Sequence, residues 1–347
     1  MTAGAHHQAR NGARGGTHGD IRHTVKLVAA FAAIYLIWGS TYLGIRFAIE
    51  TIPPLLMMGA RNFLAGVLLY SWMRTRGAPA PDGQQWRAAL ATGAMLFLVD
   101  HGALAWAEQR VASGLAALLS ATLPFSMVLM ARAMGREKKL TGRALSGLFL
   151  GLAGVALLVG PDTLFHGGAT DIVGCGAILI GTIFWSAGSI YGRVARLPAS
   201  PALSAGMQMT AGGGALLCAG LLFGEGAQLH LSAVTSRSLL SFGYLIVFGS
   251  IVAFTAYIWL LGVSLPSRVS TYAYVNPVVA LLLGWALAGE PVGVRTCAAA
   301  AIILAGVALV NSGTGAMAHG QAGRAEAPPR ESLSGATPVP EGSSQQR

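Results

Sequence analysis

The chain has 347 residues, of which 54% are hydrophobic and only 10% charged, and its mean hydropathy is +0.59. This composition excludes an ordinary soluble globule, whose surface needs more polar side chains, and predicts that the lipid bilayer is the main partner. The net charge of +10 would favour nucleic-acid binding in a soluble protein. Here the basic residues gather in short loops between apolar runs, so we expect no nucleic acid as a partner.

Residues 1–24 are rich in Gly, His and Arg and contain no apolar run, which predicts a disordered arm and no signal peptide. Ten apolar segments follow, each close to the ~20 residues that a helix needs to cross the hydrocarbon layer. The runs are continuous, without the alternation of barrel strands, so the predicted fold class is an all-α membrane protein. The expected spans are 25–48, 54–73, 86–106, 112–134, 141–159, 172–194, 201–223, 238–261, 267–288 and 294–310.

Residues 312–347 are rich in Gly, Ser, Pro and Ala, which predicts a disordered tail. The distribution of Lys and Arg among the loops predicts the orientation of the spans. Most loop Lys and Arg residues fall on the inner side when both termini are placed in the cytoplasm. We therefore expect a cytoplasmic arm, a cytoplasmic tail and a multi-pass domain between them.

A segment near the start of the chain returns once in its second half. YLIWGSTYLGIR at 35–46 corresponds to TIFWSAGSIYGR at 182–193, so that Trp38 matches Trp185, and LAGVAL at 152–157 recurs at 304–309. Five spans in each half, 25–160 and 171–311, would make the second half enter the membrane from the opposite side. Two such inverted repeats typify secondary transporters, whose substrate site lies near mid-membrane between the halves.

The repeated segments carry a polar and aromatic stripe at helical spacing. Trp38 and Tyr42 lie on the first stripe and Trp185 on the second. One interpretation is a cavity wall, in which rings hold a substrate and hydroxyls orient it. The alternative, which the spacing favours equally, is helix packing.

The third expected span contains the residues that are most costly in lipid. Asp100 and His101 lie well inside it, where a charge costs roughly 2.5–3.5 kcal/mol. His101 and Glu108 are seven residues apart on one helical face, which makes Asp100, His101 and Glu108 candidates for proton coupling. The alternative is a neutral, hydrogen-bonded histidine, and adjacent Asp100 and His101 are not expected to share one face of an α-helix.

Two repeat-related prolines, Pro124 and Pro277, predict helix kinks, because each lacks the N–H that would bond to the carbonyl one turn earlier. Freed carbonyls in a membrane line a cavity or find side-chain partners. Ser120 and Thr122 precede the first proline. The second is preceded by Tyr272, Tyr274 and Asn276.

We find no sequence signature of an enzyme, a cofactor site or a metal site in a suitable context. A membrane-embedded enzyme that acts on lipid or peptide through Asp100 and His101 remains the alternative function, and a channel-like facilitator is a third. Glycines in 141–159 favour close helix packing, either within the chain or at the face of a homodimer.

The chain resembles the EamA-type branch of the drug/metabolite transporter superfamily. The resemblance rests on IWGSTYLGIR at 37–46, AWAEQRVASGLAALLSATLPF at 105–125 and the paired halves. It implies ten helices, cytoplasmic termini and alternating access around a central cavity. The residues that it places in the cavity are Trp38, Tyr42, His101, Ser120, Trp185 and Tyr274.

Related exporters often carry Asn-Gly where this chain has His101 and Gly102, after Asp100, so their coupling chemistry does not transfer to this position. The resulting hypothesis is a secondary transporter of the bacterial inner membrane that exports small metabolites, either amino acids or amphipathic drug-like compounds. Because the chain contains no ATP-binding signature, an ion gradient or the substrate gradient would supply the energy, and protons are the candidate coupling ion.

Overall fold

The computed structural model describes residues 5–108, 119–135, 141–159, 172–288 and 293–325. Within these ranges the secondary structure consists of helices joined by turns, and no strand occurs among them. The predicted all-α membrane fold is thereby confirmed for the described part of the chain.

The first half contains α1 (Ala5–Ala48), α2 (Pro54–Thr75), α3 (Gly83–Gly93), η1 (Ala94–His101), α4 (Gly102–Glu108), α6 (Leu123–Ala133) and α7 (Gly142–Val159). The second contains α9 (Ile172–Gly192), α10 (Pro201–Leu222), α11 (Glu225–Gln228), η2 (Leu231–Ala233), α12 (Ser236–Tyr244), η3 (Leu245–Val252), α13 (Ala253–Val263), α14 (Pro266–Val269), α15 (Tyr272–Ala288) and α16 (Val294–Ala325). Both η1 and η3 are π-helices of eight residues, each inserted in a longer helix.

In the described part of the chain, six helices are long and apolar enough to cross a membrane. They are 22–48, Pro54–Thr75, 83–107, Ile172–Gly192, Pro201–Leu222 and 236–263. Leu123–Ala133, 142–157 and 297–310 are shorter apolar helices. At the two ends, α1 begins at Ala5 and α16 continues to Ala325, where the sequence predicts a disordered arm and tail.

Local sequence sets where several helices begin. Pro54 and Pro201 occupy the first turn of α2 and α10, where the missing N–H has no intrahelical partner to lose. Asp82 and Gln85 form a capping box at α3: the Asp82 carboxylate accepts from the Gln85 N–H at 2.7 Å, and the Gln85 side chain accepts from the Asp82 N–H at 3.0 Å.

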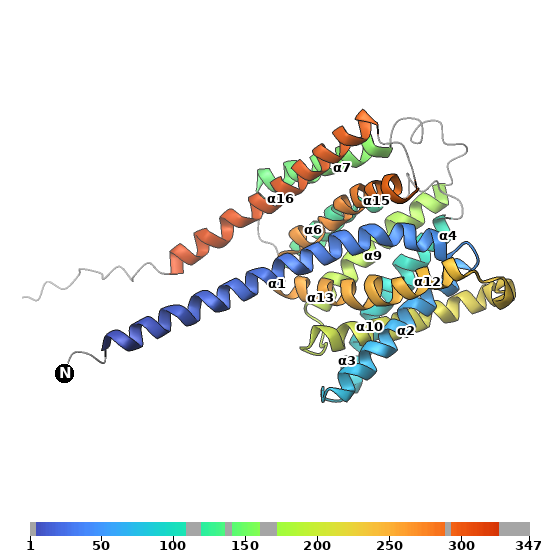
Figure 1. The fold of residues 1–347 in the computed structure, drawn as a ribbon, viewed down its shortest axis with the longest axis horizontal. Helices are drawn as coiled ribbons and strands as arrows, with labels where there is room; N and C mark the ends of the chain where they lie inside the picture. The colour runs from blue at the N-terminus through green and yellow to red at the C-terminus, as the bar shows by residue number, and fades with distance from the viewer. Residues whose placement is uncertain (1–4, 109–118, 136–140, 160–171, 289–292, 326–347) are drawn as a thin grey trace, which may run out of the picture.

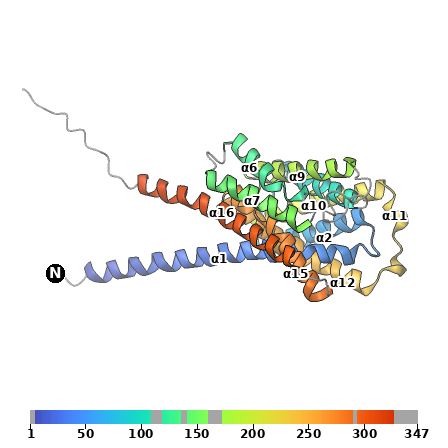
Figure 2. The ribbon, with the colours of Figure 1, turned by 90° about the horizontal axis from the view of Figure 1, so that it is seen from above.

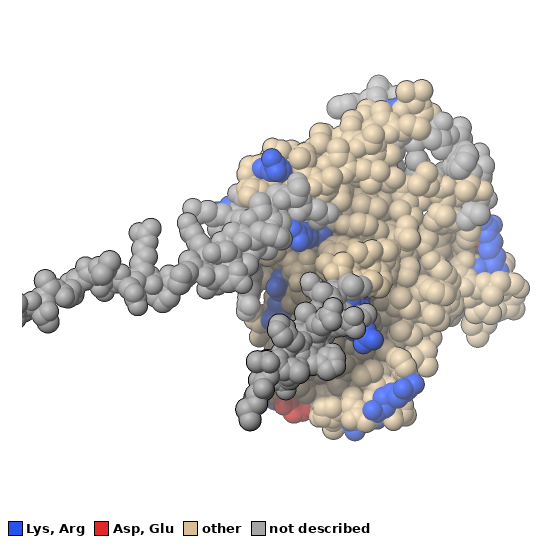
Figure 3. All heavy atoms as spheres, turned by 60° about the vertical axis from the view of Figure 1, so that its left-hand side comes forward, with Lys and Arg blue, Asp and Glu red and all other residues tan. Residues whose placement is uncertain are grey.

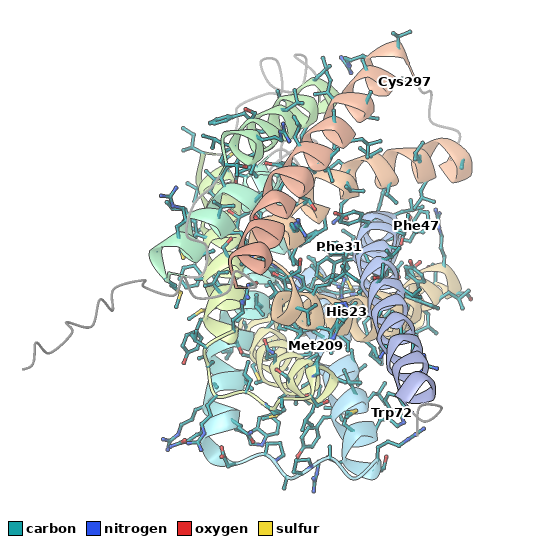
Figure 4. All side chains as sticks on the ribbon, turned by 90° about the vertical axis from the view of Figure 1, so that its left-hand side faces the viewer. His23, Phe31, Phe47, Trp72, Met209 and Cys297 are labelled. Carbon is teal, nitrogen blue, oxygen red and sulfur yellow. The ribbon has the colours of Figure 1, made fainter. Side chains whose placement is uncertain are left out.

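The helices pack in corresponding pairs (Figures 1 and 2). α2 lies along α10 and α7 lies along α16. α1 contacts η3, α13 and α15, and its repeat counterpart α9 contacts η1, α4 and α6. Figure 4 views the bundle end-on, with His23, Phe31 and Phe47 marking the course of α1.

Glycines permit the closest of these contacts. A Cβ atom at Gly66 of α2 would lie 2.3 Å from the backbone nitrogen of Thr210, and one at Gly213 of α10 would lie 2.5 Å from that of Phe63. A Cβ atom at Gly147 of α7 would likewise lie 2.7 Å from the carbonyl oxygen of Gly306 in α16. The expected glycine packing therefore occurs within the chain at these positions.

The outer surface is apolar over large areas. Leu36, Leu68, Phe149, Ile180 and Leu240 are all more than half exposed. On the face drawn in Figure 3, tan side chains cover most of the described surface, and Lys and Arg stand in isolated groups. Such a surface suits contact with lipid chains.

Candidate functional site

A cavity lies inside the bundle, with about 120 Å³ of space for the centres of water-sized molecules. Because one water needs roughly 10–15 Å³ by this measure, the cavity can hold several waters or a small metabolite. Its lining comes from helices of both halves. The lining residues are Trp38, Thr41, Ile45, Met58, Arg61, Asn62, Phe97, Asp100, His101, Leu104, Ser120, Leu123, Ile178, Thr182, Trp185, Gly249, Ser250, Phe254, Tyr272, Ala273 and Asn276.

Two repeat-related tryptophans meet at this cavity. The rings of Trp38 on α1 and Trp185 on α9 are 5.9 Å apart between centroids, edge to face at 77°. Each indole N–H donates a hydrogen bond across the bundle, Trp38 to the carbonyl of Gly249 at 3.0 Å and Trp185 to the hydroxyl of Tyr257 at 2.9 Å. These bonds fix both rings, so the aromatic wall is preorganised.

His101 lies between aromatic rings and an amide. Its ring stacks on Trp185 with centroids 5.6 Å apart at 22°, and Phe97 meets it edge-on at 5.2 Å. Its Nδ1 is 3.1 Å from the Asn62 Nδ2. Since the amide nitrogen is a donor, His101 accepts this bond at Nδ1 and carries its proton on the other ring nitrogen.

A chain of hydrogen bonds joins His101 to Arg61. The Arg61 Nε donates to the Ser250 hydroxyl at 3.3 Å, and that hydroxyl donates to the Asn62 Oδ1 at 3.1 Å. The Asn62 amide then donates to the Met58 carbonyl at 2.9 Å and to His101. Arg61, Asn62 and Ser250 are almost fully buried, so α2 and η3 hold this polar group rigidly against the cavity.

Asp100 and His101 both line the cavity, so the expectation that adjacent residues would not share a face is wrong here. They end η1, in which the backbone is wound as a π-helix with i→i+5 bonds and more residues per turn than an α-helix. This winding narrows the angle between neighbouring side chains. Asp100 also lies close to Gly181, where a Cβ atom would be 3.0 Å from the Asp100 Oδ1.

The structure brings Trp38, His101, Ser120 and Trp185 to the cavity, together with Asp100. Tyr274 lies elsewhere: it is fully buried, and its hydroxyl donates to the Leu148 carbonyl of α7 at 3.1 Å. The side chains of Tyr42 and Glu108 are outside the described residues.

The two prolines stand in different settings. Pro124 is in the first turn of α6, after a turn at residues 121–122, whereas Pro277 is inside α15. On α15 the residues that reach the cavity are Tyr272, Ala273 and Asn276. Tyr272 and Asn276 are four residues apart and share a helical face, which Tyr274 does not.

The sequence reasoning missed Arg61 and Asn62. A signal was present, because Arg61 is the only charged residue in the expected span 54–73, and a charge at membrane depth marks a functional position by default. Among the described residues, no group of three or more His, Cys, Asp or Glu side chains is placed to hold a metal ion.

The fold and cavity define a class, an α-helical membrane protein with an aromatic and polar cavity inside its bundle. The sequence matches the EamA-like transporter family at residues 26–160 and 172–312, and the chain belongs to this family.

Individual relatives are named as transporters. The chain is 38% identical over 295 residues to "Uncharacterized inner membrane transporter YedA" of Escherichia coli K12, which covers 84% of this chain and 92% of that protein. It is 24% identical to "Uncharacterized transporter YoaV" of Bacillus subtilis, over 82% and 96% of the two chains. A solved crystal structure at 21% identity matches with a TM-score of 0.67 and covers 82% of this chain and 97% of that one, which shows the fold alone.

Proposed function

We propose that this protein is a secondary active transporter that exports small metabolites, amino acids or amphipathic drug-like compounds, by alternating access at the cavity described above. The observation that carries the proposal is the meeting of Trp38 and Trp185 at that cavity. Corresponding residues of two sequence repeats meet in this way when the halves are related by an axis that passes between them.

The packing of the helices supports the two-fold relationship. Contacts of α1 with η3, α13 and α15 are matched by contacts of α9 with η1, α4 and α6. The π-helices η1 and η3 occupy corresponding places in the two halves. A pair of halves that share one cavity can expose it to either side by rocking against each other, which is the basis of alternating access.

The positions of the chain ends support cytoplasmic termini. In Figures 1 and 2 the beginning of α1 and the end of α16 project from the same end of the bundle. This arrangement fits ten spans with both termini on one side of the inner membrane, the side that the Lys and Arg distribution favours. A fluorescent protein fused to either terminus should fluoresce, because the fused protein becomes fluorescent only in the cytoplasm.

A metabolite-tolerance screen and counterflow test the function together. Cells with and without the gene are compared for tolerance to a panel of metabolites and drugs, and the hits are tested on purified protein in liposomes. We expect preloaded unlabelled substrate to drive uptake of the labelled substrate, which a carrier performs and an open channel does not. Liposomes without protein are the control. No counterflow for any hit would overturn the proposal, and recovery of a covalently changed substrate would favour the enzyme alternative.

A cysteine at Ser120 tests alternating access. Cys175, Cys218 and Cys297 are free thiols, so they are first replaced by serine, and Ser120→Cys then places one thiol in the cavity. A membrane-impermeant reagent should label it from either side of oriented vesicles, and substrate should shift the ratio of the two rates. Labelling from one side only, with and without substrate, would contradict alternating access.

A further inference from the structure

Arg61 is a buried cation, and among the described residues no acidic side chain forms an ion pair with it. It is 5% exposed, and its Nε donates to the Ser250 hydroxyl while its Nη1 is 3.8 Å from the Met58 sulfur. By contrast, Arg237 pairs with Glu50 at 3.6 Å on the surface. A buried charge that no opposite charge compensates is destabilising, so its presence at the cavity needs another explanation.

The unused donors of Arg61 are available to a ligand. A guanidinium has five N–H groups in a planar fork, and the contacts above use one for a hydroxyl and one for a weak sulfur acceptor. Ser250 is itself held by Asn62, so the fork is fixed in direction. Fixed guanidinium forks bind carboxylates through two parallel hydrogen bonds.

A second residue of the cavity lining carries an acceptor that no described residue pairs with. The Asn276 Oδ1 on α15 is buried and accepts no hydrogen bond from any described residue, and Asn276 lines the cavity with only 4% of its surface exposed. Asp100 adds a carboxyl group to the lining. A ligand that offers an N–H group would satisfy the amide oxygen, which costs free energy when it is left unpaired.

We infer that Arg61 binds a carboxylate group of the transported molecule and that Asn276 accepts a hydrogen bond from an N–H group of the same molecule. The inference rests on the proposed function and makes its substrate class narrower. Trp38, Phe97 and Trp185 offer an apolar surface for the remainder of the molecule. Lipophilic cations, which would place a positive charge near Arg61, are excluded as the preferred substrates.

Three related probes separate these contributions. Leucine carries a carboxylate and an ammonium group, and 4-methylpentanoate carries only the carboxylate. Leucinamide carries the ammonium group with a neutral carboxamide in place of the carboxylate. Binding to the purified full-length protein is followed by the tryptophan emission, since Trp38 and Trp185 line the cavity. We expect leucine to bind more tightly than 4-methylpentanoate, and leucinamide to bind most weakly.

Variants assign the contributions to residues. Arg61→Gln should weaken the binding of leucine and 4-methylpentanoate by about tenfold or more, because a charged hydrogen-bonded pair is lost. It should leave the binding of leucinamide unchanged or make it tighter, because the repulsion between Arg61 and the ammonium group is removed. Arg61→Lys keeps the positive charge but not the planar fork of donors, so its affinity for the two carboxylates should lie between those of the native protein and of Arg61→Gln. Asn276→Ala should remove the advantage of leucine over 4-methylpentanoate. Arg46→Gln, an exposed arginine of α1 outside the cavity lining, is the matched control. Size-exclusion profiles show which variants fold, and Arg61→Lys carries the test if Arg61→Gln does not.

The inference is overturned if the native protein binds none of the carboxylates, or if loss of Arg61 weakens leucinamide as much as leucine. The proposed function is tested separately, by counterflow in liposomes. Carboxylate binding that depends on Arg61, without counterflow, would contradict the transport proposal but support the assignment of Arg61. Counterflow of a cationic drug that is unchanged in Arg61→Gln would support the transport proposal but contradict the assignment of Arg61.

Discussion

The Trp38 indole N–H donates a hydrogen bond to the Gly249 carbonyl at 3.0 Å, joining α1 of the first half to the π-helix η3 of the second. Gly249 also lines the cavity. Trp38, which belongs to the repeated segment 35–46, therefore has two roles: its ring forms part of the cavity wall, and its N–H joins the two halves.

Trp38→Phe keeps an aromatic ring and removes this hydrogen bond. We expect a loss of about 1 kcal/mol in unfolding free energy, because the Gly249 carbonyl loses its donor, together with weaker substrate binding. Thermal unfolding in detergent and counterflow in liposomes measure the two effects. Trp72→Phe, at a position that is about half exposed, should change neither, and an equal effect at both positions would contradict the prediction.

His101→Gln tests proton coupling. Glutamine can still accept the hydrogen bond from Asn62, but it cannot take up a proton at neutral pH. We expect uptake driven by a pH gradient to be abolished while counterflow, which needs no net proton movement, is retained. His23→Gln, at an exposed histidine of α1, is the control. Undiminished gradient-driven uptake by the His101 variant would remove His101 from the coupling mechanism.

Glu225, which is distant from α2 in the sequence, stabilises the beginning of that helix. Its carboxylate is buried and accepts from the N–H groups of Leu55 and Leu56 at 3.2 and 2.8 Å. Glu225→Ala should lower the unfolding free energy by about 1–2 kcal/mol, because the N–H groups of Leu55 and Leu56 at the helix N-terminus lose their side-chain acceptor. Glu50→Ala removes a surface ion pair and should cost less than about 0.5 kcal/mol. Equal thermal shifts for the two variants would refute the capping role.

Gly212 packs against Gly93 where α10 crosses α3. A Cβ atom at Gly212 would lie 2.1 Å from the Gly93 carbonyl oxygen. Gly212→Ala should therefore force the helices apart and destabilise the protein by about 1–3 kcal/mol. At Gly243 of α12 the space around a Cβ atom is free, so Gly243→Ala should be neutral or stabilising. Thermal unfolding of both variants decides the matter.

Several features of the fold follow from sequence alone. The apolar runs predict where the helices lie, because a chain in lipid must satisfy its backbone hydrogen bonds within each span. Pro54 and Pro201 begin α2 and α10 as expected of residues that lack an N–H. The repeat also singled out Trp38 and Trp185 from 347 residues, and the structure brings their rings to 5.9 Å from each other at the cavity.

The tertiary structure decided which side chains share the cavity. Periodicity defines a helical face but not which neighbour covers it, so Tyr274 packs on α7 while Tyr272 reaches the cavity. The π-helix η1 turns both Asp100 and His101 toward the cavity, and no propensity in the sequence predicts that change of winding. Arg61 gains its environment from Ser250, which is far away in sequence. Such a contact depends on how α2 and η3 pack, and only the assembled bundle determines that.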